Sequence, residues 1–111
     1  MSAPTARDPD FAARIARSFD RQGAMHLIGA TLAHVAPGEV DIVLPVAAKI
    51  TQQHGFVHAG IVSTIADSAA GFASLTLLPA GSGILTAEFK INLLAPAAGE
   101  RLVAKGRVFK P

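Results

Sequence analysis

Apolar side chains recur with helical spacing in two parts of this chain of 111 residues. Over residues 11–19 a large apolar residue returns every four positions with arginines between, which predicts an amphipathic helix over residues 8–22. Asp8 suits the cap of this helix because a proline follows it, and Gly23 suits its end. Residues 58–77 are apolar on nearly every side, which predicts a second helix that is long and buried.

Alternation of apolar with other side chains predicts four strands arranged as two hairpins. The first hairpin pairs residues 24–35 with residues 40–46, and the second pairs residues 84–94 with residues 100–110. Turn residues that include Pro and Gly separate the two strands of each pair. Pro45 has no N–H to donate to a ladder, so the second strand is expected to lie at an edge of the sheet there.

The order helix, hairpin, helix, hairpin predicts an α+β domain in which an antiparallel sheet packs against the long helix. The length of the chain fits a single domain over residues 1–111. Four strands of this length cannot cover a helix that is apolar on every side. We therefore expect a partner subunit, or further chain, to cover part of the 58–77 helix.

Composition and charge narrow the classes of function. The net charge is +2 and no cluster of Lys or Arg is present, so nucleic-acid binding is not expected. The chain has no Cys, which excludes a thiol nucleophile and Cys-based zinc sites. Residues 1–10 lack the apolar core of a signal peptide, and the apolar stretch 59–80 carries Asp67 near its middle. We expect a cytoplasmic protein with no membrane contact.

The polar loop that leads into the long helix holds the strongest candidate chemistry. Residues 52–57 run into a helix start near residues 58–60, where the first backbone N–H groups have no partner within the helix. Such N–H groups can hold a carboxylate, a phosphate or a developing oxyanion. Asp67 lies two turns further on, and it is the only Asp, Glu, Lys or Arg between Lys49 and Glu88. A carboxylate in so apolar a helix is costly unless it is paired or used.

The same residues allow other interpretations. Asp67 could be a surface residue of the helix, or its carboxylate could be satisfied by Ser63 and Thr64. His54 and His58 lie four residues apart, which suggests a metal site with Asp67 as third ligand. The change from loop to helix between the two histidines argues against a shared face, and the His-Glu-x-x-His pattern is absent. The residues therefore predict no metal.

The stretch from Gly55 to Gly60, followed seven residues later by Asp67, resembles the His-Gly-Gly…Asp motif of hotdog-fold acyl-CoA thioesterases. It is most similar to the phenylacetate-degradation (PaaI-type) branch. Residues 86–96 resemble the third strand of that family, which ends in a small residue and Pro, and the order of elements agrees over nearly the whole chain. The resemblance implies a hotdog fold, an antiparallel sheet wrapped around a long central helix, in a homodimer or homotetramer.

The same resemblance implies an enzyme that hydrolyses an acyl-CoA thioester to a free acid and CoA without a cofactor. Asp67 would act as general base or as nucleophile, and the backbone N–H of Ala59 would donate to the oxyanion. Gln52 would orient the thioester or the water, and His58 would support the loop and contact the thioester. Thr86 would position water near the carboxylate. In this family the carboxylate of one subunit faces the oxyanion loop of the other.

The resemblance further implies substrate contacts at Gly55, Gly60 and Ser63, and the sequence departs from the family pattern in two places. The usual His-Gly-Gly contains Ala59 at its centre, which is harmless where φ is negative and strained where φ is positive. Residues 106–111 end the chain at the fourth predicted strand, so the C-terminal strands are expected to be missing. The alternatives to an active enzyme are a non-catalytic acyl-CoA-binding hotdog protein and an inactive, domain-swapped fragment.

Overall fold

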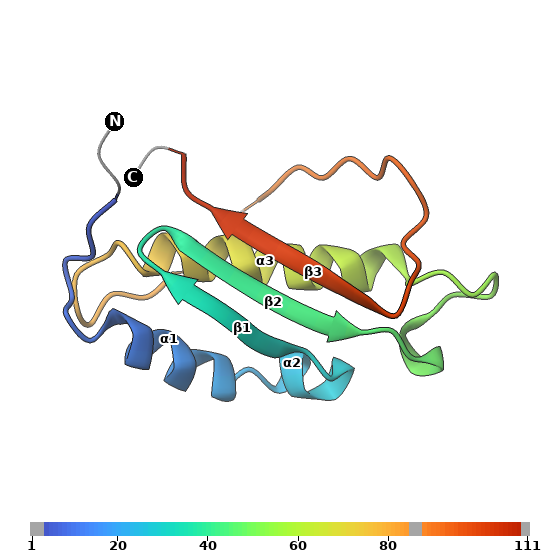
Figure 1. The fold of residues 1–111 in the computed structure, drawn as a ribbon, viewed down its shortest axis with the longest axis horizontal. Helices are drawn as coiled ribbons and strands as arrows, with labels where there is room; N and C mark the ends of the chain where they lie inside the picture. Colours follow the sequence, from blue (N-terminus) through green and yellow to red (C-terminus); the bar gives the residue numbers. More distant parts are fainter. Residues whose placement is uncertain (1–3, 85–87, 110–111) are drawn as a thin grey trace.

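The computed structural model describes residues 4–84 and 88–109. In chain order its elements are α1 (Phe11–Asp20), α2 (Gly23–Ile28), β1 (Thr31–Ala36), β2 (Glu39–Pro45), the short 3-10 helix η1 (Ala48–Ile50), α3 (Ala59–Leu75) and β3 (Arg101–Arg107). The strands form one sheet, and α3 runs along one face of it (Figure 1). This confirms the predicted α+β arrangement of an antiparallel sheet against a long helix. No helix within the described residues has the length and apolar character needed to cross a membrane.

The strand β2 lies at the centre of the sheet, but at Pro45 it is paired on one side only, which bears out the expectation of an edge at this residue. The order is β1-β2-β3, and both pairings are antiparallel. Val46 donates its N–H to the carbonyl of Glu100, on the β3 side, at 2.9 Å. The nitrogen of Pro45 therefore faces the opposite side, where β1 has not yet begun because Thr31 pairs with Val43. The missing donor of Pro45 costs no hydrogen bond of the ladder.

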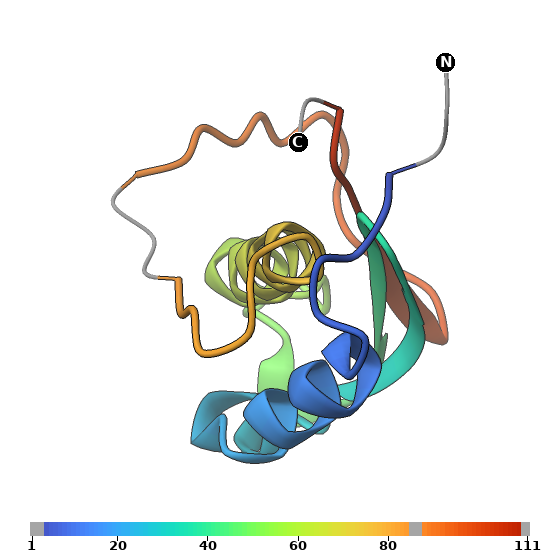
Figure 2. The same ribbon diagram turned by 90° about the vertical axis from the view of Figure 1, so that its left-hand side faces the viewer.

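The second predicted hairpin is wrong, because β3 pairs with β2 and not with the segment before it. The ladder runs from Glu39 opposite Arg107 to Pro45 opposite Arg101. The described part of the predicted strand 84–94 forms no strand; it curves around α3 at a distance from the sheet (Figure 2). Three residues beyond this segment, the N–H of Val57 donates to the carbonyl of Ala97 at 2.9 Å. This bond holds the segment to the loop before α3.

Charged side chains at one end of the sheet reinforce the pairing of β2 with β3. Arg107 lies opposite Glu39 in the ladder, and its Nε is 3.8 Å from Glu39 Oε2. Its Nη1 donates to Asp41 Oδ1 at 2.7 Å. The hydrogen bond to Asp41, together with the charges of both carboxylates, raises the pKa of Arg107 above its usual value. Because the guanidinium is exposed to solvent, this cluster helps to select the register more than it adds stability.

Residues 24–28 form the helix α2 and not the first half of a strand. Met25 and Ile28 are both buried, and their separation of three residues is one helical turn, whereas a half-buried strand would bury every second residue. Gly29 ends this helix in the left-handed conformation, with φ of 81°. Gly23, which is predicted to end the first helix, instead begins the second. The first strand therefore starts only after Gly29.

One face of α3 packs on the sheet, and the opposite face is only partly covered. The buried face consists of residues three and four apart, Ile65, Ala69, Phe72 and Ala73. They join a core to which β2 contributes Val40, Ile42 and Leu44 and the N-terminal helices contribute Ile15, Phe19 and Met25. On the opposite face Ala66 is half-buried and Ala70 is exposed. Within the described residues, the chain thus covers only part of a helix whose sequence is apolar almost all round.

The C-terminal end of α3 is held by Arg14 of α1. Its Nη2 donates to the carbonyls of Leu75 and Leu78 at 2.7 and 3.1 Å, and its Nη1 donates to the carbonyl of Pro79 at 2.7 Å. The Arg14 side chain is only 12% exposed, although the amphipathic pattern predicts it on the outer face of the helix. A positive charge is favourable where the last helical carbonyls lack partners.

Gly106 of β3 marks the closest approach of the sheet to α3. An alanine Cβ at this position would overlap the carbonyl oxygen of Ala69 and lie 2.6 Å from its carbonyl carbon. The Ala69 carbonyl belongs to the backbone of α3 and Gly106 belongs to the backbone of β3, so neither can move without shifting its helix or strand. The absence of a side chain at Gly106 therefore sets how close the helix lies to the sheet.

We expect Gly106→Ala to lower the free energy of unfolding by about 1–3 kcal/mol, the usual range for overpacking. Gly23→Ala is the matched control, because a Cβ there would meet nothing within 4 Å. It should be neutral or stabilise by up to about 1 kcal/mol, since alanine restricts the unfolded chain. Urea denaturation measures both variants. Equal midpoints for Gly106→Ala and wild type would show that the close approach is wrong.

Candidate active site

Among the residues that the structure describes, the first turn of α3 has one backbone donor without a partner. His58 precedes the helix, and its carbonyl accepts from the N–H groups of Ile61 and Val62 at 2.9 and 3.1 Å. Its ring Nδ1 accepts from the N–H of Gly60 at 2.9 Å. Among the described residues the N–H of Ala59 meets no acceptor. A single donor at the positive end of a helix is suited to stabilising a developing negative charge.

The departure from His-Gly-Gly at Ala59 causes no strain. Within the described residues, only glycines have positive φ, so the methyl group of Ala59 sits on an ordinary helical backbone. Gly60 is the position where the missing side chain matters. A Cβ on Gly60 would lie 3.1 Å from Nδ1 and 3.3 Å from Cε1 of His58, tight enough to displace the capping ring.

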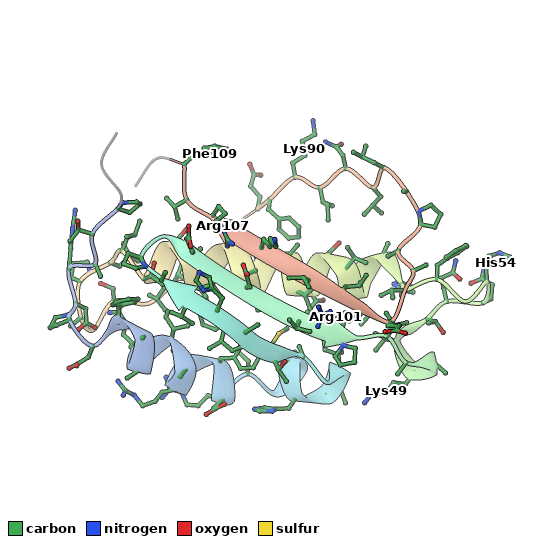
Figure 3. All side chains as sticks on the ribbon, in the orientation of Figure 1. Lys49, His54, Lys90, Arg101, Arg107 and Phe109 are labelled. Atoms are coloured by element: carbon green, nitrogen blue, oxygen red, sulfur yellow. The ribbon has the colours of Figure 1, made fainter. Side chains whose placement is uncertain are left out.

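Gln52 organises the loop before the helix. Its Oε1 accepts from the N–H groups of His54 and Phe56, at 2.6 and 3.3 Å. Its backbone N–H donates to the carbonyl of Phe56 at 2.8 Å, and Gly55 turns the chain with φ of 86°. His54 lies at the outer tip of this loop (Figure 3). The side-chain oxygen of Gln52 is therefore used to hold the loop, and its amide nitrogen makes no hydrogen bond within the described residues.

A cavity of about 610 Å³ lies at the start of α3 and brings three of the predicted site residues together. Gln52, His58 and Ala59 all line it. Phe56 and Val62 add apolar surface from the loop and the helix, and residues 93–97 add a further wall. The unpaired N–H of Ala59 thus belongs to the wall of a cavity of the size that binds small molecules.

Asp67 lines a different cavity, of about 230 Å³, further along α3. Its neighbours there include Ala66 and Ala70 of the helix and Phe89 and Ile91 of the segment that curves around it. The Asp67 side chain is half-buried. Eight residues of helix put it about 12 Å along the axis from Ala59. Within one chain, the Asp67 carboxylate and the Ala59 N–H therefore line separate cavities.

The remaining predicted residues have structural roles or lie outside the described part. The hydroxyls of Ser63 and Thr64 donate to the carbonyls of Ala59 and Gly60, one turn back in the helix, at 2.8 Å each. Thr86 lies outside the described residues. In the ranges 4–84 and 88–109, no group of three His, Asp or Glu residues is placed to hold a metal ion. The roles of these residues toward a substrate stay predictions.

The apolar wall of the larger cavity is the part of the candidate site that the sequence did not single out. Phe56 is exposed in the loop, and Leu93 is 57% exposed in the segment after α3. Val62 follows Ala59 by three residues, so a helical wheel would have placed it near the helix start. Phe56 belongs to the loop that the sequence analysis singled out, whereas Leu93 reaches this cavity only through the tertiary fold and no local pattern marks it.

We expect His58→Ala to lower the free energy of unfolding by about 0.5–2 kcal/mol, because the Gly60 N–H loses its acceptor. His58→Asn should retain most of the stability, since an asparagine oxygen is a good cap at the same place. Urea unfolding curves of both variants provide the measurement. If the two variants are equally stable, the His58 ring does not cap the helix.

Comparison with known proteins identifies the family of this chain. Residues 54–110 match the family model of the thioesterase superfamily. A thioesterase family protein from Silicibacter pomeroyi has a crystal structure with a TM-score of 0.89 and 46% sequence identity, over 91% of this chain and 74% of that one. The "Putative esterase" of Halobacterium salinarum is 30% identical over 96% of this chain and 74% of its own length. A variant of the phenylacetic acid degradation protein PaaI from Thermus thermophilus is 30% identical, with a TM-score of 0.64, over 74% of this chain and 69% of its own. The chain therefore belongs to the thioesterase superfamily and has the hotdog fold of its PaaI-type members.

Proposed function

We propose that this thioesterase hydrolyses an acyl-CoA thioester to a free acid and CoA, with Asp67 as the catalytic carboxylate and the Ala59 N–H as the oxyanion donor. The observation that carries the proposal is the unpaired N–H of Ala59 in the wall of a cavity large enough for an acyl group. Acyl-CoA as substrate is consistent with the cytoplasmic location expected from the sequence.

The chemistry needs two groups and no cofactor. As a general base, Asp67 takes a proton from water while the water oxygen attacks the thioester carbon. The charge that develops on the former carbonyl oxygen is stabilised by the Ala59 N–H. The C–S bond then breaks, and the sulfur of CoA receives the proton. As a nucleophile, Asp67 would attack the same carbon, the C–S bond would break to release CoA as its thiolate, and water would then hydrolyse the resulting anhydride to the free acid and the Asp67 carboxylate, with a proton from water passing to the thiolate.

The separation of the two groups along α3 supports a site built by two subunits. One carbonyl carbon cannot meet a carboxylate and an N–H that line separate cavities about 12 Å apart along a helix. In a two-fold symmetric dimer, Asp67 of one chain can face Ala59 of the other, and the reverse contact forms at the same time. The partly covered face of α3, where Ala66 and Ala70 lie, leaves surface for such a partner.

We expect Asp67→Asn to lower kcat for acyl-CoA hydrolysis by about 10²–10⁴, because the amide keeps the shape and loses the basicity. Asp67→Ala should lower kcat as much. The melting temperature of Asp67→Asn should change little. Released CoA thiol, measured with a thiol reagent, gives kcat. A structural aspartate would give the opposite pattern, with full activity per folded molecule in the asparagine variant.

We expect Ala59→Pro to lower kcat by about 10²–10³, the usual loss for one oxyanion donor. Proline is accepted at the first helical position, and His58 already has φ of −58° and ψ of 134°, a conformation suited to a residue before proline. Folding should therefore survive, and Ala59→Gly should keep its activity as the control. Full activity of Ala59→Pro would place the donor elsewhere.

Mixing the two inactive variants tests the shared site directly. When Asp67→Asn and Ala59→Pro chains are co-expressed, each mixed dimer contains one site with both wild-type groups. Random pairing should restore about a quarter of the wild-type activity, since half of the dimers are mixed and each has one intact site. A site within one chain would give no recovery.

A further inference from the structure

The cavity at the start of α3 differs in charge from two other cavities along this helix. None of the described residues that line it is Asp, Glu, Lys or Arg. The cavity beside Asp67 also contains Lys90, whose side chain points away from the helix in Figure 3. A third cavity of about 430 Å³, on another side of the same helix start, contains Lys49. Of these three, the first offers an uncharged, largely apolar wall next to the unpaired N–H of Ala59.

Val62 is the helical side chain placed to limit this cavity. It lies one turn after Ala59, and helical side chains lean toward the N-terminus, so its methyl groups lie over the turn that carries the N–H. The side chain is half-buried and packs against the core, which holds it in place. A valine in a helix has one strongly preferred rotamer, so this wall is stiff.

We infer that the cavity lined by Phe56, Val62 and Leu93 receives the acyl group of the thioester, that it accepts uncharged apolar acyl groups, and that Val62 sets the size of the group. The inference rests on the proposed function, because it places the thioester carbonyl at the Ala59 N–H. An acyl group with a second carboxylate would find no cation among the described residues of this wall, so burying that charge would be costly. Straight-chain and simple aryl groups need only the apolar surface.

The test measures binding separately from hydrolysis. Affinities for acetyl-, butanoyl-, hexanoyl-, octanoyl- and decanoyl-CoA are measured by calorimetry with Asp67→Asn protein, in which hydrolysis is blocked. Val62→Phe is then added to this protein. For the longest acyl-CoA that the protein with Val62 binds, this change should lower the affinity about tenfold relative to the affinity for acetyl-CoA. Val62→Ala should shift the preference about tenfold toward longer groups. Val62→Met serves if the phenylalanine variant does not fold.

Ile61→Ala is the matched control. Ile61 is also half-buried and β-branched, but it lines the cavity that contains Lys49. Its truncation should leave the ratio of affinities between long and short acyl groups unchanged. The kcat/KM values of the same series, measured with Asp67 intact, should follow the affinity ratios.

The outcomes distinguish two claims, that the cavity beside Val62 binds the acyl group and that the protein hydrolyses acyl-CoA. Ratios that change with Val62 and not with Ile61 support the acyl cavity. Ratios unaffected by Val62, or affected equally by Ile61, overturn it even where wild-type protein hydrolyses acyl-CoA. Binding that depends on Val62 without any hydrolysis overturns the proposed function and leaves the acyl cavity intact. If no acyl-CoA binds, both claims are wrong.

Discussion

The packing of one face of α3 on the sheet is the constraint on which the rest of this structure depends. Burial of Ile65, Ala69 and Phe72 supplies apolar stabilisation, and the contact between the backbones at Gly106 fixes the depth at which the helix lies. Arg14 holds the other end of the helix by its last carbonyl groups. With the helix fixed in this way, its first turn and the preceding loop become a rigid support for the unpaired N–H of Ala59.

The same helix carries both groups that we propose for the reaction, the Ala59 N–H and the Asp67 carboxylate, and this limits what one chain could do. A rigid helix keeps Ala59 and Asp67 at a constant separation, so no loop movement can bring them to one carbonyl carbon. The face that its own chain leaves partly covered is where Ala66 and Ala70 lie, and small side chains there allow a close approach. A symmetric second copy would complete the site and cover this surface at once. Catalysis and assembly would then depend on the same contact.

Much of the candidate site follows from local sequence because it lies within one loop and one helix. The loop from Gln52 and the helix start at Ala59 depend on turn chemistry and capping, which act over a few residues. The resemblance to thioesterases added roles that physical patterns alone left open, above all for Asp67. The cavity walls could not be predicted in the same way. Phe56 and Leu93 are distant in sequence, and only the path of the chain after α3 brings them to one cavity.

The sequence by itself determined the long helix, a strand over residues 40–46, the helix start near residues 58–60 and the isolated carboxylate of Asp67, because each is set by short-range spacing or composition. The tertiary structure decided the rest. Residues 24–28 alternate well enough for a strand, yet burial of Met25 and Ile28 against the core selects a helix. The strand β3 pairs with β2 and not with the segment that precedes it, and Arg107 contacts Glu39 and Asp41 across this pairing. Alternation marks a segment as able to form a strand, but the choice of partner depends on which edge lies within reach once the helix has packed.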